Sequence, residues 1–333
     1  MQKSFCSLLK KDLQMMISGK FFLLALGSLI LYTLFINLGY VNFMKAPGYG
    51  VYMYVPQGVS YPEVFSDKIE VVQSEQELYD CLSEDTNGIG IMYKGKEPEF
   101  VLYYGSNTID NHRIAYAQSL LKEKEFEDPI VVGKNTTEEK QRKEMSCELL
   151  FIEIIAVGFL GIASILFKEK QMGVMRVYGI TPAPKAFFIL SKLLVFLISD
   201  LIFAALLTIF NVRSSEAFHI LPRVLLQTGI LSLIMALIGM CCSLLLKDFK
   251  QFSLAYLVVA LFISAPVFLS ANTSAQNSWI KWHPFYHLYM GMKNAFFDFQ
   301  SEGIVYFLLC LCSIFLLFWF VKMAFMRELS KEG

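Results

Sequence analysis

Long apolar runs separated by short polar segments make up most of this chain. A run of about 18 or more apolar residues is long enough for a membrane-spanning helix. We therefore predict an all-α membrane protein with six transmembrane helices, the fifth with a kink or break at Pro266. The six runs are Phe21 to Val41, Leu149 to Phe167, Ala186 to Phe210, Val224 to Leu246, Phe252 to Leu269 and Ile304 to Phe325.

One stretch, from Lys45 to Glu144, has the composition of a soluble domain. Ser74 and Glu77 have the spacing of a capping box that begins a short helix, and a second helix is expected from Asp110 to Lys124. We predict a small α/β domain, residues 45–146, inserted between the first two spans. Its strands are expected at Gly50 to Val55, Lys68 to Val72, Gly88 to Tyr93 and Glu99 to Tyr104, with a turn at 94–97 between the last two.

The first twenty residues are amphipathic. Phe5, Leu8, Leu9, Leu13 and Met16 recur at helical spacing with lysines between them. This pattern is typical of a helix that lies on the inner leaflet of a membrane. We expect residues 1–20 to form such an elbow helix, and residues 21–44 to form the first span.

Basic residues gather on one side of the predicted membrane. Lysines and arginines precede the first span, follow the second and fourth, and close the chain, whereas the opposite short loops hold only Arg213, Arg223, Lys281 and Lys293. The positive-inside rule then places both termini in the cytoplasm and the α/β domain outside. Only 17% of the residues are charged, against about 25% in soluble domains. Low cysteine use on the outer side fits a bacterial plasma membrane, although Cys81 and Cys147 can pair there.

The polar segment 168–185 between the second and third spans carries the most specific motif. Its residues resemble the cytoplasmic loop of type-2 ABC exporter permeases, E-K-E-x-G-T-x-x-R-L-x-x-T-P with a lysine ten residues later. The matching positions are Glu169, Lys170, Gly173, Arg176, Thr181, Pro182 and Lys192. Gln171 and Val174 replace the family's second Glu and its Thr, and Arg176 comes one place early. The segment V-x-S-x-E-E-L of one branch of the family is matched by residues 72–78, with Gln76 for one Glu.

The resemblance implies a fold, partners and a function. The fold would be that of a type-2 ABC exporter, with spans two to six in residues 147–333 and an outer re-entrant segment at 271–303. Two permease subunits, identical or not, would pair with separate ABC ATPase subunits in the membrane lipid. The chain would hold no catalytic residue and no cofactor, since ATP and Mg²⁺ would bind to the partner. The exported substrate would be amphipathic: a drug, an antimicrobial peptide or a lipid.

In the coupling loop, residues 169–176 are expected to form a short helix seated in a groove of the ATPase. Met172, Met175 and Val177 would offer it apolar contacts, and Gly179 would end it. The alternative is a solvated basic loop that serves only the positive-inside rule.

Charges within spans are costly and suggest function. Glu153 and Asp200 either line a translocation path or dimer seam, or have a structural hydrogen-bonding role. Trp282, Pro284 and Tyr286 either cap such a path at the outer leaflet or belong to an interfacial aromatic belt. Gly158, Gly161 and Ala163 are small enough for close helix packing.

Other function classes find less support. The sequence lacks a phosphate-binding P-loop, and the His283 and His287 pair has no neighbouring ligands for a metal. Nothing indicates a nucleic-acid partner. A membrane-anchored receptor or sensor that uses the α/β domain, and an ion-coupled secondary transporter, remain the alternatives. The transporter is expected to show inverted repeats of broken spans, and none is recognisable.

Overall fold

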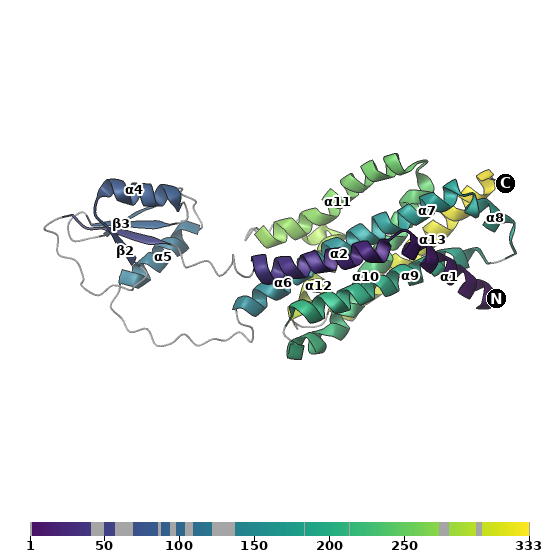
Figure 1. Cartoon of the computed structure of the whole chain (residues 1–333), viewed down its shortest axis with the longest axis horizontal. Helices are drawn as coiled ribbons and strands as arrows, with labels where there is room; N and C mark the ends of the chain where they lie inside the picture. The colour runs from purple at the N-terminus through teal and green to yellow at the C-terminus, as the bar shows by residue number, and fades with distance from the viewer. Residues whose placement is uncertain are drawn as a thin grey trace. The chain divides into compact units, whose positions relative to one another are not determined.

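The chain forms two compact units, which Figure 1 shows as a helical part and an α/β part. The computed structural model describes residues 2–40, 50–56, 69–85, 88–93, 98–103, 109–121, 137–182, 184–212, 214–272, 280–297 and 302–332. The helical unit comprises Met1–Met44 and Asn135–Gly333, and the α/β unit comprises Lys45–Lys134. The inserted unit thus ends before the expected residue 146, because residues from Thr137 onward begin a long helix of the helical unit.

The helical unit begins with the two elements expected from the sequence. Helix α1 (Gln2–Ser18) is the amphipathic segment, and α2 (Phe21–Leu34) continues into the π-helix η1 (Phe35–Tyr40). After the α/β unit, the chain forms one nearly continuous rod of α6 (Thr137–Ala156), the π-helix η2 (Val157–Gly161) and α7 (Ile162–Gln171). The remaining elements are α8 (Val174–Ile180), α9 (Lys185–Asn211), α10 (Ser214–Leu245), α11 (Phe249–Asn272), η3 (Ile280–Trp282), α12 (Pro284–Phe297) and α13 (Ile304–Glu332).

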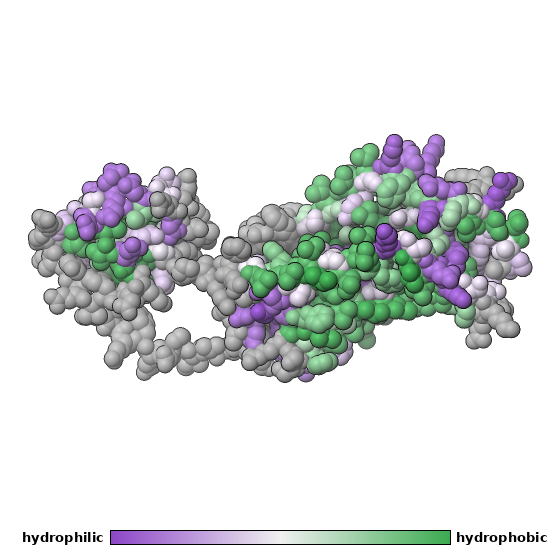
Figure 2. Space-filling model, in the orientation of Figure 1, coloured by the Kyte–Doolittle hydropathy of each residue, from purple (hydrophilic) through white to green (hydrophobic). Residues whose placement is uncertain are grey.

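Within the described residues, five helical segments are long and apolar enough to cross a membrane, which makes this a multi-pass membrane protein by length and composition. They are Phe21–Tyr40, Glu138–Gln171, Lys185–Asn211, Glu216–Leu245 and Ile304–Ser330. The expected fifth span lies in α11, whose apolar part Phe249–Ala265 is shorter than the other five. Helix α11 runs on to Asn272, so it does not break at Pro266. Figure 2 shows hydrophobic residues over the middle of this unit and hydrophilic residues toward its ends.

Helix α10 is the centre of the helical unit. It packs against α9, α12, α13 and the rod of α6, η2 and α7. Glycines make the closest approach possible: a Cβ on Gly239 would lie 2.8 Å from the carbonyl oxygen of Phe159, and one on Gly158 would lie 2.9 Å from Cβ of Met235. A Cβ on Gly161 would lie 2.8 Å from the ring of Phe196. The close packing expected at Gly158 and Gly161 is therefore confirmed.

The α/β unit contains a four-stranded sheet in the order β2-β1-β3-β4. Strand β1 (Val51–Tyr54) pairs in parallel with β2 (Ile69–Val72) and β3 (Ile89–Tyr93), and β4 (Pro98–Val101) is antiparallel to β3. The four predicted strands are confirmed, as are the two helices α4 (Glu75–Glu84) and α5 (Ile109–Leu121). The turn expected at 94–97 lies outside the described residues.

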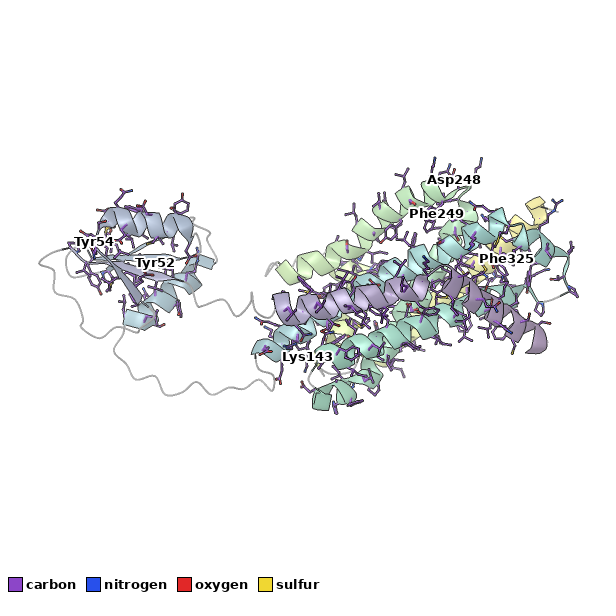
Figure 3. The ribbon with its side chains drawn as sticks, in the orientation of Figure 1. Tyr52, Tyr54, Lys143, Asp248, Phe249 and Phe325 are labelled. Carbon is purple, nitrogen blue, oxygen red and sulfur yellow. The ribbon has the colours of Figure 1, made fainter. Side chains whose placement is uncertain are left out.

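Two helices cover the two faces of this sheet (Figure 1). Side chains alternate along β1, so Val51 and Met53 join the core with α5, whereas Tyr52 and Tyr54 pack on the side of α4. Figure 3 labels both tyrosines near α4. Strand β3 is buried on both faces, which explains why its sequence is a continuous apolar run. The cysteine pair considered above, Cys81 in this unit and Cys147 in the helical unit, consists of free thiols.

Candidate functional site

The junction between α7 and α9 contains the residues of the predicted coupling loop. Helix α7 ends at Gln171, and Gly173 adopts a left-handed conformation with φ 67°, which glycine adopts without the steric cost that a Cβ brings. The short helix α8 then runs from Val174 to Ile180. The expected helix over 169–176 is therefore wrong in its position, because Gly173 interrupts it and Glu169 still belongs to α7.

Helix α8 is fastened to the start of α9 at its C-terminal end. The Lys185 ammonium donates to the carbonyl oxygens of Tyr178, Gly179 and Thr181 at 2.9, 2.9 and 3.1 Å. The Tyr178 hydroxyl donates to the carbonyl oxygen of Pro184 at 2.8 Å. The three bonds from Lys185 go to carbonyls at the end of α8, where a helix leaves carbonyls without intrahelical partners. Helix α8 and the start of α9 thus form one braced corner.

One face of this corner is exposed and apolar. The exposed fractions of Met172, Val177 and Ile180 are 53%, 61% and 85%, and the Arg176 side chain is exposed beside them. Met175, by contrast, is fully buried. The expected outward contacts are thus available from Met172 and Val177 but not from Met175, and the sequence analysis missed Ile180. Of the other two loop positions, Thr181 is half-buried and Pro182 is exposed.

Behind α8 lies a buried cluster of four charges, which we call the four-charge cluster: Lys11 and Asp12 of α1, Glu169 of α7 and Lys192 of α9. The Lys192 ammonium lies 2.9 Å from Asp12 Oδ1 and 2.9 Å from Glu169 Oε2. Lys11 forms an ion pair with Glu169 and lies 3.4 Å from Asp12. The Ser191 hydroxyl donates to Asp12 Oδ2 at 2.6 Å.

The cluster is neutral as a whole and nearly closed to solvent. The side chains of Asp12, Glu169 and Lys192 are at most 1% exposed, whereas Lys11 is 33% exposed. Burial lowers the pKa of Lys11, but the carboxylates of Glu169 and Asp12 outweigh this effect and raise the pKa above its ordinary value. Buried charges persist when they are paired and hydrogen-bonded in this way. The cluster therefore joins α1, α7 and α9.

One expectation for this region needs correction. Glu169 was expected to face an ATPase, but it is buried in the four-charge cluster. Lys192, the lysine that completes the motif, lies inside the same cluster. Lys170 also turns inward: its ammonium contacts the Ser243 carbonyl oxygen and the Glu328 carboxylate, each at 3.0 Å.

An aromatic stack continues the same packing toward α13. The rings of Phe188 and Phe325 stack with centroids 4.6 Å apart and planes 8° apart, and Tyr178 lies beside both. Figure 3 labels Phe325 on α13. The corner at α8 is therefore in direct contact with α9 and α13, and through the four-charge cluster with α1 and α7.

Glu153 occupies a different place, in the rod of α6 and α7 facing α2. Its carboxylate accepts hydrogen bonds from the Ser28 hydroxyl at 2.9 Å and from the Tyr32 hydroxyl at 2.7 Å. It also lines a cavity of about 520 Å³. The sequence analysis missed both hydroxyl partners, since nothing in a single span indicates which neighbour it will face.

Asp200 lies on α9 and faces α10. It is 4% exposed, and its carboxylate accepts a hydrogen bond from the Ser232 hydroxyl of α10 at 2.5 Å. It does not line the cavity beside Glu153. The structure therefore does not bring the two carboxylates together in one cavity.

The aromatic segment forms η3 and α12. Trp282 is 88% exposed, Pro284 is the first residue of α12, and Tyr286 is half-buried. With 14 residues, α12 extends about 21 Å, which is shorter than a bilayer core of about 30 Å. It packs against α6, α10 and α11. Among the described residues, no group of three or more His, Cys, Asp or Glu side chains is placed to hold a metal ion.

A scan against models of known protein families found no match, and a search of curated proteins found no relative either. The family resemblance therefore depends on the sequence motifs alone.

Proposed function

We propose that this chain is the membrane permease subunit of an ATP-driven ABC exporter. The observation that carries the proposal is the braced corner at α8, which presents Met172, Arg176, Val177 and Ile180 outward at one end of the helical unit. A short helix with an exposed apolar face and a flanking cation suits a shallow groove on a partner protein. The partner would be an ABC ATPase.

The contacts behind α8 are suited to transmitting force. Movement of α8 would be passed to α9 through Lys185 and Tyr178, and to α7 and α1 through the four-charge cluster. Packed cores and ion-pair networks have discrete arrangements, so they transmit such a displacement better than a flexible loop would. ATP binding by the partner would thereby change the packing of α1, α7 and α9 together.

The wider assembly follows from the same proposal. Both termini and α8 lie at one end of the helical unit (Figure 1), which the basic residues would place in the cytoplasm. Helix α11 would be the sixth span, and α12 would be the outer re-entrant segment. Two permease subunits, identical or not, would pair in a bacterial plasma membrane with the α/β unit outside. Glu153 and Asp200 would line the translocation path or the dimer seam.

A test of the docking surface uses the exposed side chains alone. The tagged full-length chain is purified from its native membranes and assayed for a co-purifying protein with Mg²⁺-dependent, vanadate-sensitive ATP hydrolysis. Val177→Asp with Ile180→Asp is expected to remove that activity, because two charges would enter an apolar contact. The thermal unfolding midpoint is expected to stay unchanged, since both positions are exposed.

The matched control changes charge on an exposed helix of the α/β unit, at Gln76→Lys. This variant is expected to retain the ATPase. A receptor or a secondary transporter would bind no ATPase at all, so the absence of such an activity from the unmodified chain would refute the proposal. Normal ATPase recovery with the doubly substituted α8 would refute the docking surface.

Orientation has its own test. A cysteine introduced for Gln76, in a chain with Cys6→Ser and Cys81→Ser, is expected to react with an impermeant thiol reagent in intact cells. Reaction only after permeabilisation would show that the α/β unit lies in the cytoplasm, and it would contradict the proposed export function.

A further inference from the structure

The cavity beside Glu153 has the size and composition of a binding site for one small amphiphile. It lies between α1 and α2 on one side and the rod of α6, η2 and α7 on the other, and Phe249 at the start of α11 also lines it. Figure 3 labels Phe249. Its volume of about 520 Å³ falls within the range of about 300–1,000 Å³ that is typical of small-molecule sites. Most of its lining is apolar, including Met15, Met16 and Leu24.

The charged groups of the lining are few and far apart. Glu153 and Lys168 both line the cavity, and 15 positions of helix separate them, or about 22 Å along the axis. Ser28 and Ser164 are the polar residues between. A ligand that fits this cavity therefore meets a carboxylate at one end, a hydrocarbon wall along its length, and an ammonium only at the other end.

Glu153 differs from the two acidic side chains of the four-charge cluster, because its partners are not charged. Asp12 and Glu169 are each paired with two lysines. The contacts described for Glu153 are with two neutral hydroxyls, and within the described residues it forms no ion pair. Two hydroxyl donors orient the carboxylate and leave lone pairs free for a further partner. A carboxylate in an apolar setting gains most from a partner with positive charge.

We propose that this cavity binds a hydrophobic organic cation, with its charge against Glu153 and its apolar groups against Met15, Met16 and Leu24. As a statement about the exported substrate, this rests on the proposed function. Binding itself requires no ATPase, so the test below stands apart from the docking test.

The probe is radiolabelled tetraphenylphosphonium, whose charge is permanent, and its counterpart is tetraphenylborate, which has the same shape and the opposite charge. The full-length chain is purified without an ATPase, and binding is measured by scintillation proximity. Glu153→Gln keeps the length and an oxygen acceptor for the two hydroxyls but removes the charge. This variant is expected to weaken tetraphenylphosphonium binding about tenfold or more, and not to weaken tetraphenylborate binding.

Two further variants separate the site from other effects. Glu138→Gln removes a carboxylate from the same helix, α6, at a position outside the cavity lining. It is expected to leave the affinity for tetraphenylphosphonium within about twofold. Ser164→Phe fills part of the cavity without touching Glu153 and is expected to weaken binding of the cation. Equal affinity in Glu153→Gln and the unmodified chain would overturn the proposal, as would a similar loss in Glu138→Gln. Absence of cation binding in the unmodified chain would overturn it as well, while leaving the export function to its own test.

Discussion

Replacing Lys192 with methionine tests whether the four-charge cluster holds the helical unit together. The substitution keeps an unbranched side chain of similar length but removes the ammonium that lies 2.9 Å from both Asp12 and Glu169. Two carboxylates then remain with Lys11 alone, which is 33% exposed. Removing one partner of a buried ion pair costs about 3–5 kcal/mol, since an uncompensated charge stays in a medium of low polarity.

The expected cost converts into a measurable shift. A unit of this size loses about 2 °C of unfolding midpoint per kcal/mol, so Lys192→Met is expected to lower the midpoint by about 6–10 °C. Differential scanning fluorimetry of the purified full-length chain measures this directly. Lys168→Met is the matched control, because Lys168 is an exposed lysine next to Glu169. It is expected to change the free energy of unfolding by no more than about 0.5 kcal/mol.

A second substitution shows whether the charge imbalance is the cause. Glu169→Gln added to Lys192→Met restores neutrality, because Asp12 and Lys11 then remain as one pair. The double variant is expected to be more stable than the sum of the two single losses predicts, by about 0.5–3 kcal/mol. Strict additivity, or a midpoint for Lys192→Met equal to that of Lys168→Met, would refute the reasoning.

Three further outcomes follow from the contacts described. In α10, Gly239→Ala is expected to destabilise the protein by about 1–3 kcal/mol, because its Cβ would meet the backbone of η2 at 2.8 Å. Gly229→Ala is the control, because its Cβ would be in ordinary contact at 3.6 Å. It is expected to be neutral or stabilising in the same thermal assay. The raised pKa of Lys11 stabilises the fold fully below its ordinary value of 10.5 and less as the pH rises through the raised value. The midpoint should therefore fall above about pH 10.5, and Lys11→Met should flatten that part of the profile; an unchanged profile would contradict the ion pairs of Lys11. In the α/β unit, Ser74→Ala removes the acceptor for the Glu77 amide and is expected to cost about 1 kcal/mol. Amide exchange in α4 should become faster than in the unmodified chain, while exchange in α5 stays the same. An unchanged exchange rate in α4 would contradict the cap.

The sequence predicted the elements of this protein well. Apolar runs of membrane length predicted the long helices, and apolar residues at helical spacing with lysines between them predicted α1. Segments rich in Val, Ile and Tyr predicted the strands of the α/β unit. These signals lie within a few residues of chain. The capping box was also readable: the Ser74 hydroxyl accepts from the Glu77 amide at 3.1 Å. The Glu77 carboxylate reaches the Gln73 amide at 2.7 Å, one residue before the expected one.

The predicted coupling loop shows where local patterns stop being sufficient. Gly173 was recognised as part of the motif, yet the helix was predicted across it, over residues 169–176, whereas α8 begins after it at Val174. The direction of Glu169 was wrong for a related reason. Its position on α7 follows from the sequence, but the side of α7 that faces α1 and α9 depends on how three helices pack.

Long-range pairing was decided by the tertiary structure alone. Asp12 and Lys192 are separated by 180 positions, and Ser28 and Glu153 by 125, so no periodicity along the chain links them. The lone acidic residue among the lysines of α1 was the only local sign of the cluster. The sequence by itself determined most of the helices and strands and the five helices of membrane length, because hydrophobic period and length act locally. Which buried charges meet, and that Glu153 lines a cavity, follows only from helix packing, since each charge is stabilised by partners that the fold brings from distant segments.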